Sequence, residues 1–80
     1  MTKDDIKKRL ETKIHSGVVE VKDMTGLSNH FSILVISNQF INLSLIQRHQ
    51  LIYSFFKEEL TKEIHALQIN TYTKEEWDKK

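Results

Sequence analysis

The sequence predicts a two-layer α+β domain in which two helices cover one face of a three-stranded mixed sheet. In residues 2–16 and 40–61, apolar side chains recur at steps of three and four, as on one side of a helix. In residues 18–23, 31–36 and 66–72, the side chains alternate with period two, which is typical of strands. The predicted order is helix, strand, strand, helix, strand and short helix.

The central helix is predicted from the stretch 40–67, FINLSLIQRHQLIYSFFKEELTKEIHAL, which leads into a strand starting at His65. Ser44 and Gln47 have the spacing of a capping box. One face of this helix is expected to be buried and comprises Leu45, His49, Ile52, Phe56 and Leu60.

The other elements have their own signals. Thr2 with Asp5 is a second capping box, and Gly17 is expected to end the first helix. The turn between the first two strands is short enough for a hairpin, and the long helix is then a right-handed crossover to a parallel third strand. Thr73 repeats the cap pattern, which leaves Trp77 free to fold back on the sheet.

The two faces of the sheet differ in polarity. Strand 31–36 is apolar on both sides and is therefore expected to be central. The core is expected to contain Phe31, Ile33, Val35, Ile52, Phe56, Leu67 and Ile69. The second face is expected to be open to solvent or to a partner and includes Glu20, Lys22, Ser32, Gln68 and Asn70.

The composition argues against several functional classes of protein. The net charge of +1 provides no strong basic field for non-specific nucleic-acid binding. Without cysteine, any soft metal centre needs sulfur from a partner.

The charged start of the chain argues against a signal or transit peptide, and no apolar run is long enough to span a bilayer. We expect a single domain over residues 1–80, in the cytoplasm rather than the mitochondrial matrix. No catalytic motif is present, so we expect no enzyme.

Six runs along the chain resemble the BolA family, in the family's order: VEVKD, HFSILVIS, QRHQLIYS, EEL, IHAL and TYTKEEW. The resemblance implies a fold similar to the type II KH domain. It also implies a non-enzymatic partner of monothiol glutaredoxins in iron–sulfur trafficking and iron sensing. The pair would share a bridging [2Fe–2S] cluster that needs the glutaredoxin and glutathione, with none held by the isolated chain. Some members are transcriptional regulators linked to cell shape and stress, so a DNA-binding regulator is the alternative.

The resemblance implies that His65, within IHAL, ligates the shared cluster. The residues alone leave a second role open, in which His65 ties the helix–strand junction by hydrogen bonds. His30 is a second candidate ligand with less support. It matches a histidine that is common at this place in the family, and the resemblance favours a structural role for it. Residues 24–29 lack the cysteine or histidine that the family often places there as a second ligand.

Arg48 is the candidate contact for a partner or for the phosphates of nucleic acid, although a solvated helix flank is the commoner state of such a residue. The glycine loop of a KH fold, which clamps a nucleic-acid backbone, corresponds here to residues 41–44, where no glycine occurs. Asn42 stands where the family often has glycine, which weakens this alternative. We expect His49 to be a satisfied packing residue and His15 to suit the end of the first helix.

Overall fold

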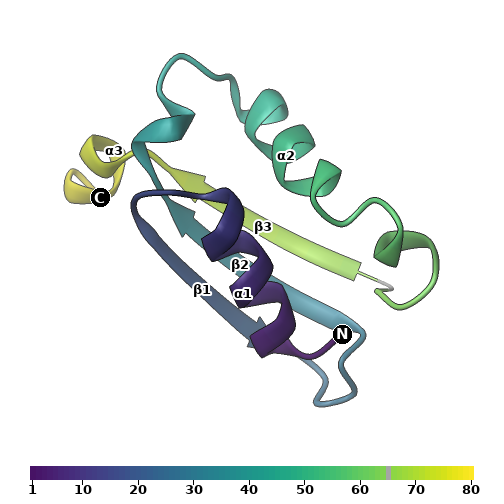
Figure 1. Cartoon of the computed structure of the whole chain (residues 1–80). Coiled ribbons are helices and arrows are strands. Elements are labelled where there is room, and N and C mark those ends of the chain that lie inside the picture. Colours follow the sequence, from purple (N-terminus) through teal and green to yellow (C-terminus); the bar gives the residue numbers. More distant parts are fainter. Residues whose placement is uncertain (65) are drawn as a thin grey trace.

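The computed structural model describes residues 1–64 and 66–80 and confirms an α+β fold (Figure 1). The elements in chain order are α1 (Lys3–Lys13), β1 (Val18–Asp23), β2 (His30–Ile36), the 3-10 turn η1 (Asn38–Phe40), α2 (Leu45–Ser54), the 3-10 turn η2 (Glu59–Thr61), β3 (Ala66–Tyr72) and α3 (Lys74–Asp78). In the described part of the chain, no helix has the length and apolar character needed to cross a membrane.

The three strands form one sheet in the order β1-β2-β3. β1 and β2 pair antiparallel, with Val19 opposite Val35, and β2 and β3 pair parallel, with Ile33 opposite Ile69. This confirms the predicted hairpin, the crossover and the central position of β2. Helices α1 and α2 lie on the same side of the sheet, and α3 lies near the end of β3 (Figure 1). The type II KH-like description stays a prediction.

The core fills the space between the helices and the sheet. Its fully buried side chains are Ile6, Leu10, Phe31, Ile33, Val35, Phe40, Ile52 and Phe56. Ile69 is also buried, whereas Leu67 is only partly so. Burial of these side chains supplies the main driving force for folding of such a small domain.

The central helix is shorter than predicted, because α2 ends at Ser54 and the chain turns before η2. The amide of Phe55 bonds to the carbonyl of Ile52, and the amide of Phe56 to that of Tyr53, which tightens the last turn. Nη1 of Arg9 then donates to the Phe55 carbonyl at 3.1 Å. A tertiary contact thus satisfies a carbonyl that the end of the helix leaves free.

The predicted buried stripe of this helix is wrong at Leu45, whose side chain is 61% exposed. Arg48 takes the inner position instead, with its side chain 11% exposed and its guanidinium 5.8 Å from the centre of the Phe40 ring. Further along α2 the prediction is correct, since Ile52 and then Phe56 are fully buried.

Gly17 does not end the first helix, which stops at Lys13 with Ile14 as its cap. Gly17 has φ of +128°, and a Cβ at this position would lie 1.9 Å from the carbonyl oxygen of Ile36. The residue is therefore needed for the close approach of the backbone to the end of β2.

All three predicted capping boxes are present. The Thr2, Ser44 and Thr73 hydroxyls each accept the N3 amide, and the N3 side chain accepts the cap amide in return. Trp77 does fold back as predicted, and its ring centroid lies 5.2 Å from that of Tyr72 in an edge-to-face contact.

Candidate functional site

The start of β2 and the start of β3 meet at one edge of the sheet. His30 pairs with Ala66 in the parallel register, and the Ala66 amide donates to the Asn29 carbonyl at 3.2 Å. His30 is half-buried and lies, as predicted, on the same face as Ser32. The structure therefore places His30 beside the residue that follows His65 in the chain. His65 itself, the predicted ligand, lies outside the described residues.

The loop that leads to His30 is organised by the carboxylate of Asp23. This carboxylate accepts the amides of Thr25, Gly26 and Ser28 at 3.3, 2.9 and 3.0 Å. Burial alone would raise the pKa of Asp23, but these backbone donors outweigh it and hold the pKa below its ordinary value. The loop therefore has a defined shape, with Leu27 74% exposed at its tip.

The donor atoms available at this edge are few. The chain contains no cysteine, and residues 1–64 and 66–80 contain no group of three or more histidine, cysteine or acidic side chains that could hold a metal ion. Iron–sulfur clusters are held mainly by thiolates, with histidine as an occasional replacement. The described part of this edge therefore offers the imidazole of His30 and no thiolate as donors to a metal centre.

Arg48, the predicted nucleic-acid contact, is held within the protein. Its Nη1 and Nη2 donate to Oε1 and Oε2 of Glu76 at 2.7 and 3.2 Å, and its Nε donates to the Leu43 carbonyl at 3.0 Å. The Arg48 guanidinium, helped by the Thr73 amide, lowers the pKa of Glu76 to about 2. Contact between Arg48 and nucleic acid stays a prediction.

The loop before α2 has the backbone shape of a glycine turn although it contains no glycine. Asn42 has φ of +68°, in the left-handed region that asparagine tolerates better than most residues. The absence of glycine therefore does not remove the turn. Near this turn, the side chains of Ile41 and Ile46 are 53% and 70% exposed. Together with Leu45 they form an exposed apolar surface.

His49 on α2 is half-buried, as expected for a packing residue. It is not fully satisfied, however, because its buried Nε2 has no hydrogen-bond partner in the described part of the chain.

The sheet face that was expected to be open carries a hollow that the sequence did not predict. Tyr72 and Trp77 line it together with Lys80, and the polar residues Glu20, Lys22 and Asn70 lie around it. Strand parity offered a signal, because Tyr72 falls on the same face as Asn70. The position of Trp77 depends on how α3 folds back.

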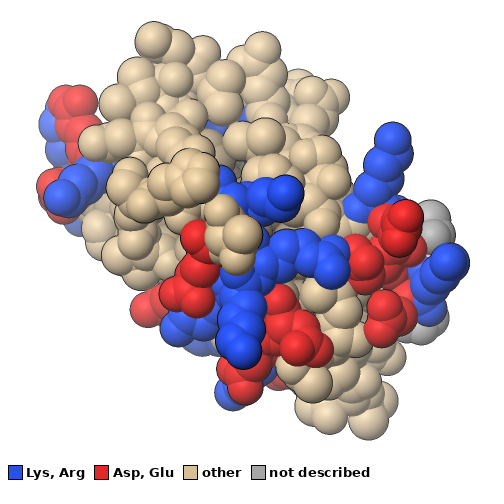
Figure 2. All heavy atoms as spheres, viewed as in Figure 1, with Lys and Arg blue, Asp and Glu red and all other residues tan. Residues whose placement is uncertain are grey.

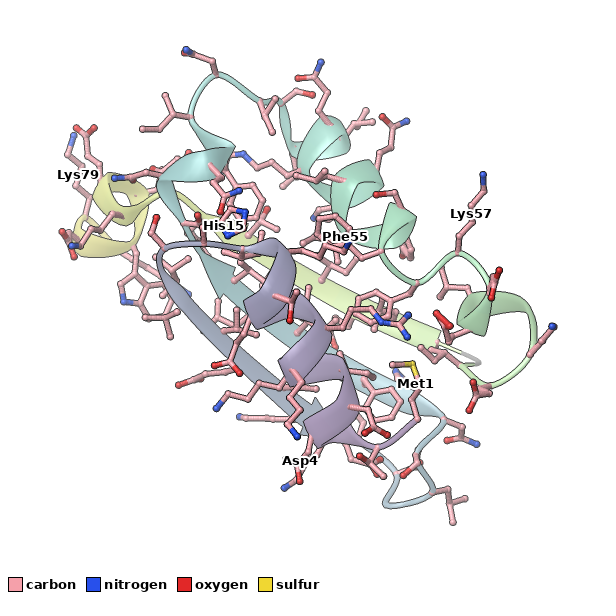
Figure 3. The ribbon with its side chains drawn as sticks, in the orientation of Figure 1. Met1, Asp4, His15, Phe55, Lys57 and Lys79 are labelled. Atoms are coloured by element: carbon pink, nitrogen blue, oxygen red, sulfur yellow. The ribbon has the colours of Figure 1, made fainter. Side chains whose placement is uncertain are left out.

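Among the described residues, the helical side of the molecule has no large patch of a single charge (Figure 2). Figure 2 shows acidic and basic side chains intermixed over α1, while uncharged residues dominate near the start of α2. At the opposite end, the terminal amine of Met1 pairs with Glu63 at 2.8 Å, which ties the start of the chain to the segment before β3 (Figure 3).

The described residues therefore form a small α+β domain whose sheet has one covered and one open face, with His30 at one edge. The chain belongs to the BolA-like protein family, whose model matches residues 5–76. Neither this family description nor the names of the relatives below denote an enzyme.

Three relatives illustrate the similarity. The DNA-binding transcriptional regulator BolA of Escherichia coli is 32% identical over 85 residues, covering 98% of this chain and 81% of the relative. The BolA domain of SufE1 from Arabidopsis thaliana has a TM-score of 0.85 and 31% identity, covering 92% of this chain and 93% of that one. Yeast Fra2 has a TM-score of 0.78 and 34% identity, covering 99% and 86%.

Proposed function

We propose that this protein is a non-enzymatic adaptor that binds a monothiol glutaredoxin and shares a [2Fe–2S] cluster with it in iron–sulfur trafficking or iron regulation. The observation that supports the proposal most is the sheet edge at which the starts of β2 and β3 meet. There His30 lies beside Ala66, and the Asp23-ordered loop presents exposed apolar residues for a partner.

The chemistry follows from the donor set. The glutaredoxin cysteine and glutathione supply thiolates, and His65 supplies one imidazole in place of a thiolate. Exchanging thiolate for imidazole raises the reduction potential of such a cluster, as in Rieske centres. In this proposal His30 shapes the docking edge, and Leu27 and Met24 of the loop contact the partner.

The test compares His65→Ala with His30→Ala in the reconstituted complex with a monothiol glutaredoxin and glutathione. We expect His65→Ala to abolish the visible circular dichroism of the mixed cluster and the nitrogen coupling in pulsed electron paramagnetic resonance. His30→Ala should weaken docking modestly and keep the coupling. His15→Ala is the matched control, because His15 is exposed and follows the cap of α1. Loss of the coupling in His30→Ala alone would reverse the assignment.

A second candidate function is binding of duplex DNA as a transcriptional regulator linked to stress and cell shape. The names of relatives from Escherichia coli and Vibrio cholerae, at 32% and 36% identity, favour it, and so does the glycine-like turn at Asn42. Affinity for duplex DNA should then fall steeply between about 50 and 200 mM salt, because phosphate contacts release counterions. Asn42→Gly should retain binding, since glycine adopts the same turn. Absence of binding at low salt would rule this candidate out.

A further inference from the structure

We propose that the open face of the sheet binds the unpaired bases of single-stranded nucleic acid. The site is a hollow of about 270 Å³ between the outer strands and α3. This inference goes beyond the adaptor function and uses none of the residues assigned to it. It also differs from the duplex-DNA candidate, which is argued from Arg48 and the turn at Asn42, because neither residue lines the hollow.

The wall of the hollow is an aromatic pair. Tyr72 comes from the end of β3 and Trp77 from α3, and their rings meet at 66°. Trp77 is 37% exposed, although tryptophan is the largest apolar side chain. Aromatic rings on an open sheet face are a common platform on which bases of single strands stack. The angled pair can therefore hold one base against a ring face.

The ring faces are accessible from the hollow, because the chain already places a cation on them. The Nζ of Lys80 lies 4.8 Å from the Tyr72 ring centre and 4.9 Å from that of Trp77, and it donates to the Tyr72 hydroxyl at 3.1 Å. A stacked base would replace the two exposed cation–π contacts of Lys80, and the displaced ammonium group can bond a phosphate in place of the Tyr72 hydroxyl.

The floor of the hollow offers groups that suit the edge of a base. Leu34 provides an apolar surface, and Ser32 and Asn70 lie beside it. The Asn70 carboxamide donates to the Ile33 carbonyl at 3.5 Å, which is longer than the usual distance for such a hydrogen bond. Its donors and acceptor can turn toward a base at little cost. We therefore expect a modest preference among bases rather than strict sequence reading.

The charge around the hollow limits how many phosphates it can bind. Lys22 and Lys80 contribute two ammonium groups, and Glu20 contributes one carboxylate. One or two phosphate contacts give a slope of only about −0.7 to −1.4 in a plot of log K against log salt. A shallow salt dependence therefore distinguishes this stacking site from duplex binding.

The aromatic wall of the hollow and the candidate cluster edge lie at opposite ends of β3, although Ser32 in the floor of the hollow is only two residues from His30. The strand runs from Ala66, beside His30, to Tyr72, a span of about 20 Å at the usual rise of a strand. A glutaredoxin and a single strand can therefore bind at different places. Failure of one proposal leaves the other testable.

The experiment uses Trp77 as its own probe, because it is the only tryptophan in the chain. The intact protein is titrated with a deoxythymidine hexanucleotide, an abasic hexanucleotide, a stable hairpin duplex and a lysine-rich peptide, and tryptophan fluorescence is recorded. We expect saturable quenching by the base-bearing single strand and little by the other three. Equal quenching by the abasic strand would overturn the proposal, since phosphates alone would then explain binding. Quenching by a lysine-rich peptide but not by the hexanucleotide would overturn it too, and would mark a face for basic proteins.

Substitutions test whether the hexanucleotide binds at the hollow. With a labelled hexanucleotide and fluorescence anisotropy, Trp77→Ala should weaken binding about 10-fold and Lys22→Glu a few-fold. Lys57→Glu makes the same charge change at a side chain that points into solvent beyond α2 (Figure 3) and should leave the affinity unchanged. Circular dichroism confirms that each variant is folded. Unchanged affinity in folded Trp77→Ala would refute the site.

Discussion

Arg48 and Glu76 form a bidentate ion pair that joins α2 to α3, with nitrogen–oxygen distances of 2.7 and 3.2 Å. The Glu76 carboxylate also accepts the amide of Thr73, and so completes the cap of α3. Because α3 contains Trp77, this pair fixes one wall of the open-face hollow. The buried stem of Arg48 at the same time replaces Leu45 on the inner side of α2.

This pair predicts a defined acid sensitivity. The pKa of Glu76 falls from an ordinary 4.5 to about 2 in the folded protein, so its stabilising effect is complete above pH 4.5 and is lost as the pH falls toward 2. Asp5 and Asp23, whose pKa values are also lowered, act in the same direction. Urea unfolding at pH 7, 4 and 2.5 should show a smaller loss of stability in Glu76→Gln than in the unchanged protein. Glu75→Gln, at an exposed pair with Lys79, should behave like the unchanged protein.

Gly17 should be intolerant of a side chain. Gly17→Ala is expected to cost about 3 kcal/mol or more, because the new methyl group would meet the Ile36 carbonyl in a backbone already at positive φ. Gly26→Ala is the matched control, since Gly26 also has positive φ but open space around it, and should cost about 1 kcal/mol. Chemical denaturation measures both. Equal costs would show that the contact with Ile36 is unimportant.

Two substitutions that shorten a side chain to alanine test which face of α2 is buried. Phe56→Ala should cost about 3–5 kcal/mol, because the ring is fully buried and Arg9 lies 5.4 Å above it. Leu45→Ala should change stability by no more than about 0.5 kcal/mol, because that side chain is mostly in solvent. A large cost at Leu45 would instead favour the apolar stripe predicted from the sequence.

The adaptor proposal predicts that the isolated protein holds no cluster tightly. Without cysteine the chain lacks the thiolates that normally bind one. Anaerobic reconstitution of this protein alone, without glutathione, should yield no stable visible absorption after desalting. The same treatment with a monothiol glutaredoxin and glutathione should yield a coloured complex. A stable coloured form of the chain by itself would contradict the proposal.

Most of the fold was predictable because its signals are local. The period of two in 31–36 and the cap at Thr73 each depend on a few neighbouring residues. The end of α2 was not predicted, and the Phe55 carbonyl at that end accepts a bond from Arg9, which lies 46 positions away in the chain. The backbone at Asn42 was also missed, since asparagine permits positive φ without requiring it.

The same distinction between local signals and tertiary contacts applies to the candidate sites. The sequence by itself determined the strands, their order, the absence of thiolates and the family resemblance that singles out His65 and His30. Only the tertiary structure decided that His30 lies beside Ala66, that Arg48 is paired with Glu76, and that Trp77 meets Tyr72 on the open face. The reason is physical. Periodicity and capping act between near neighbours, whereas these contacts join residues that only the packed helices and the register of the sheet bring together.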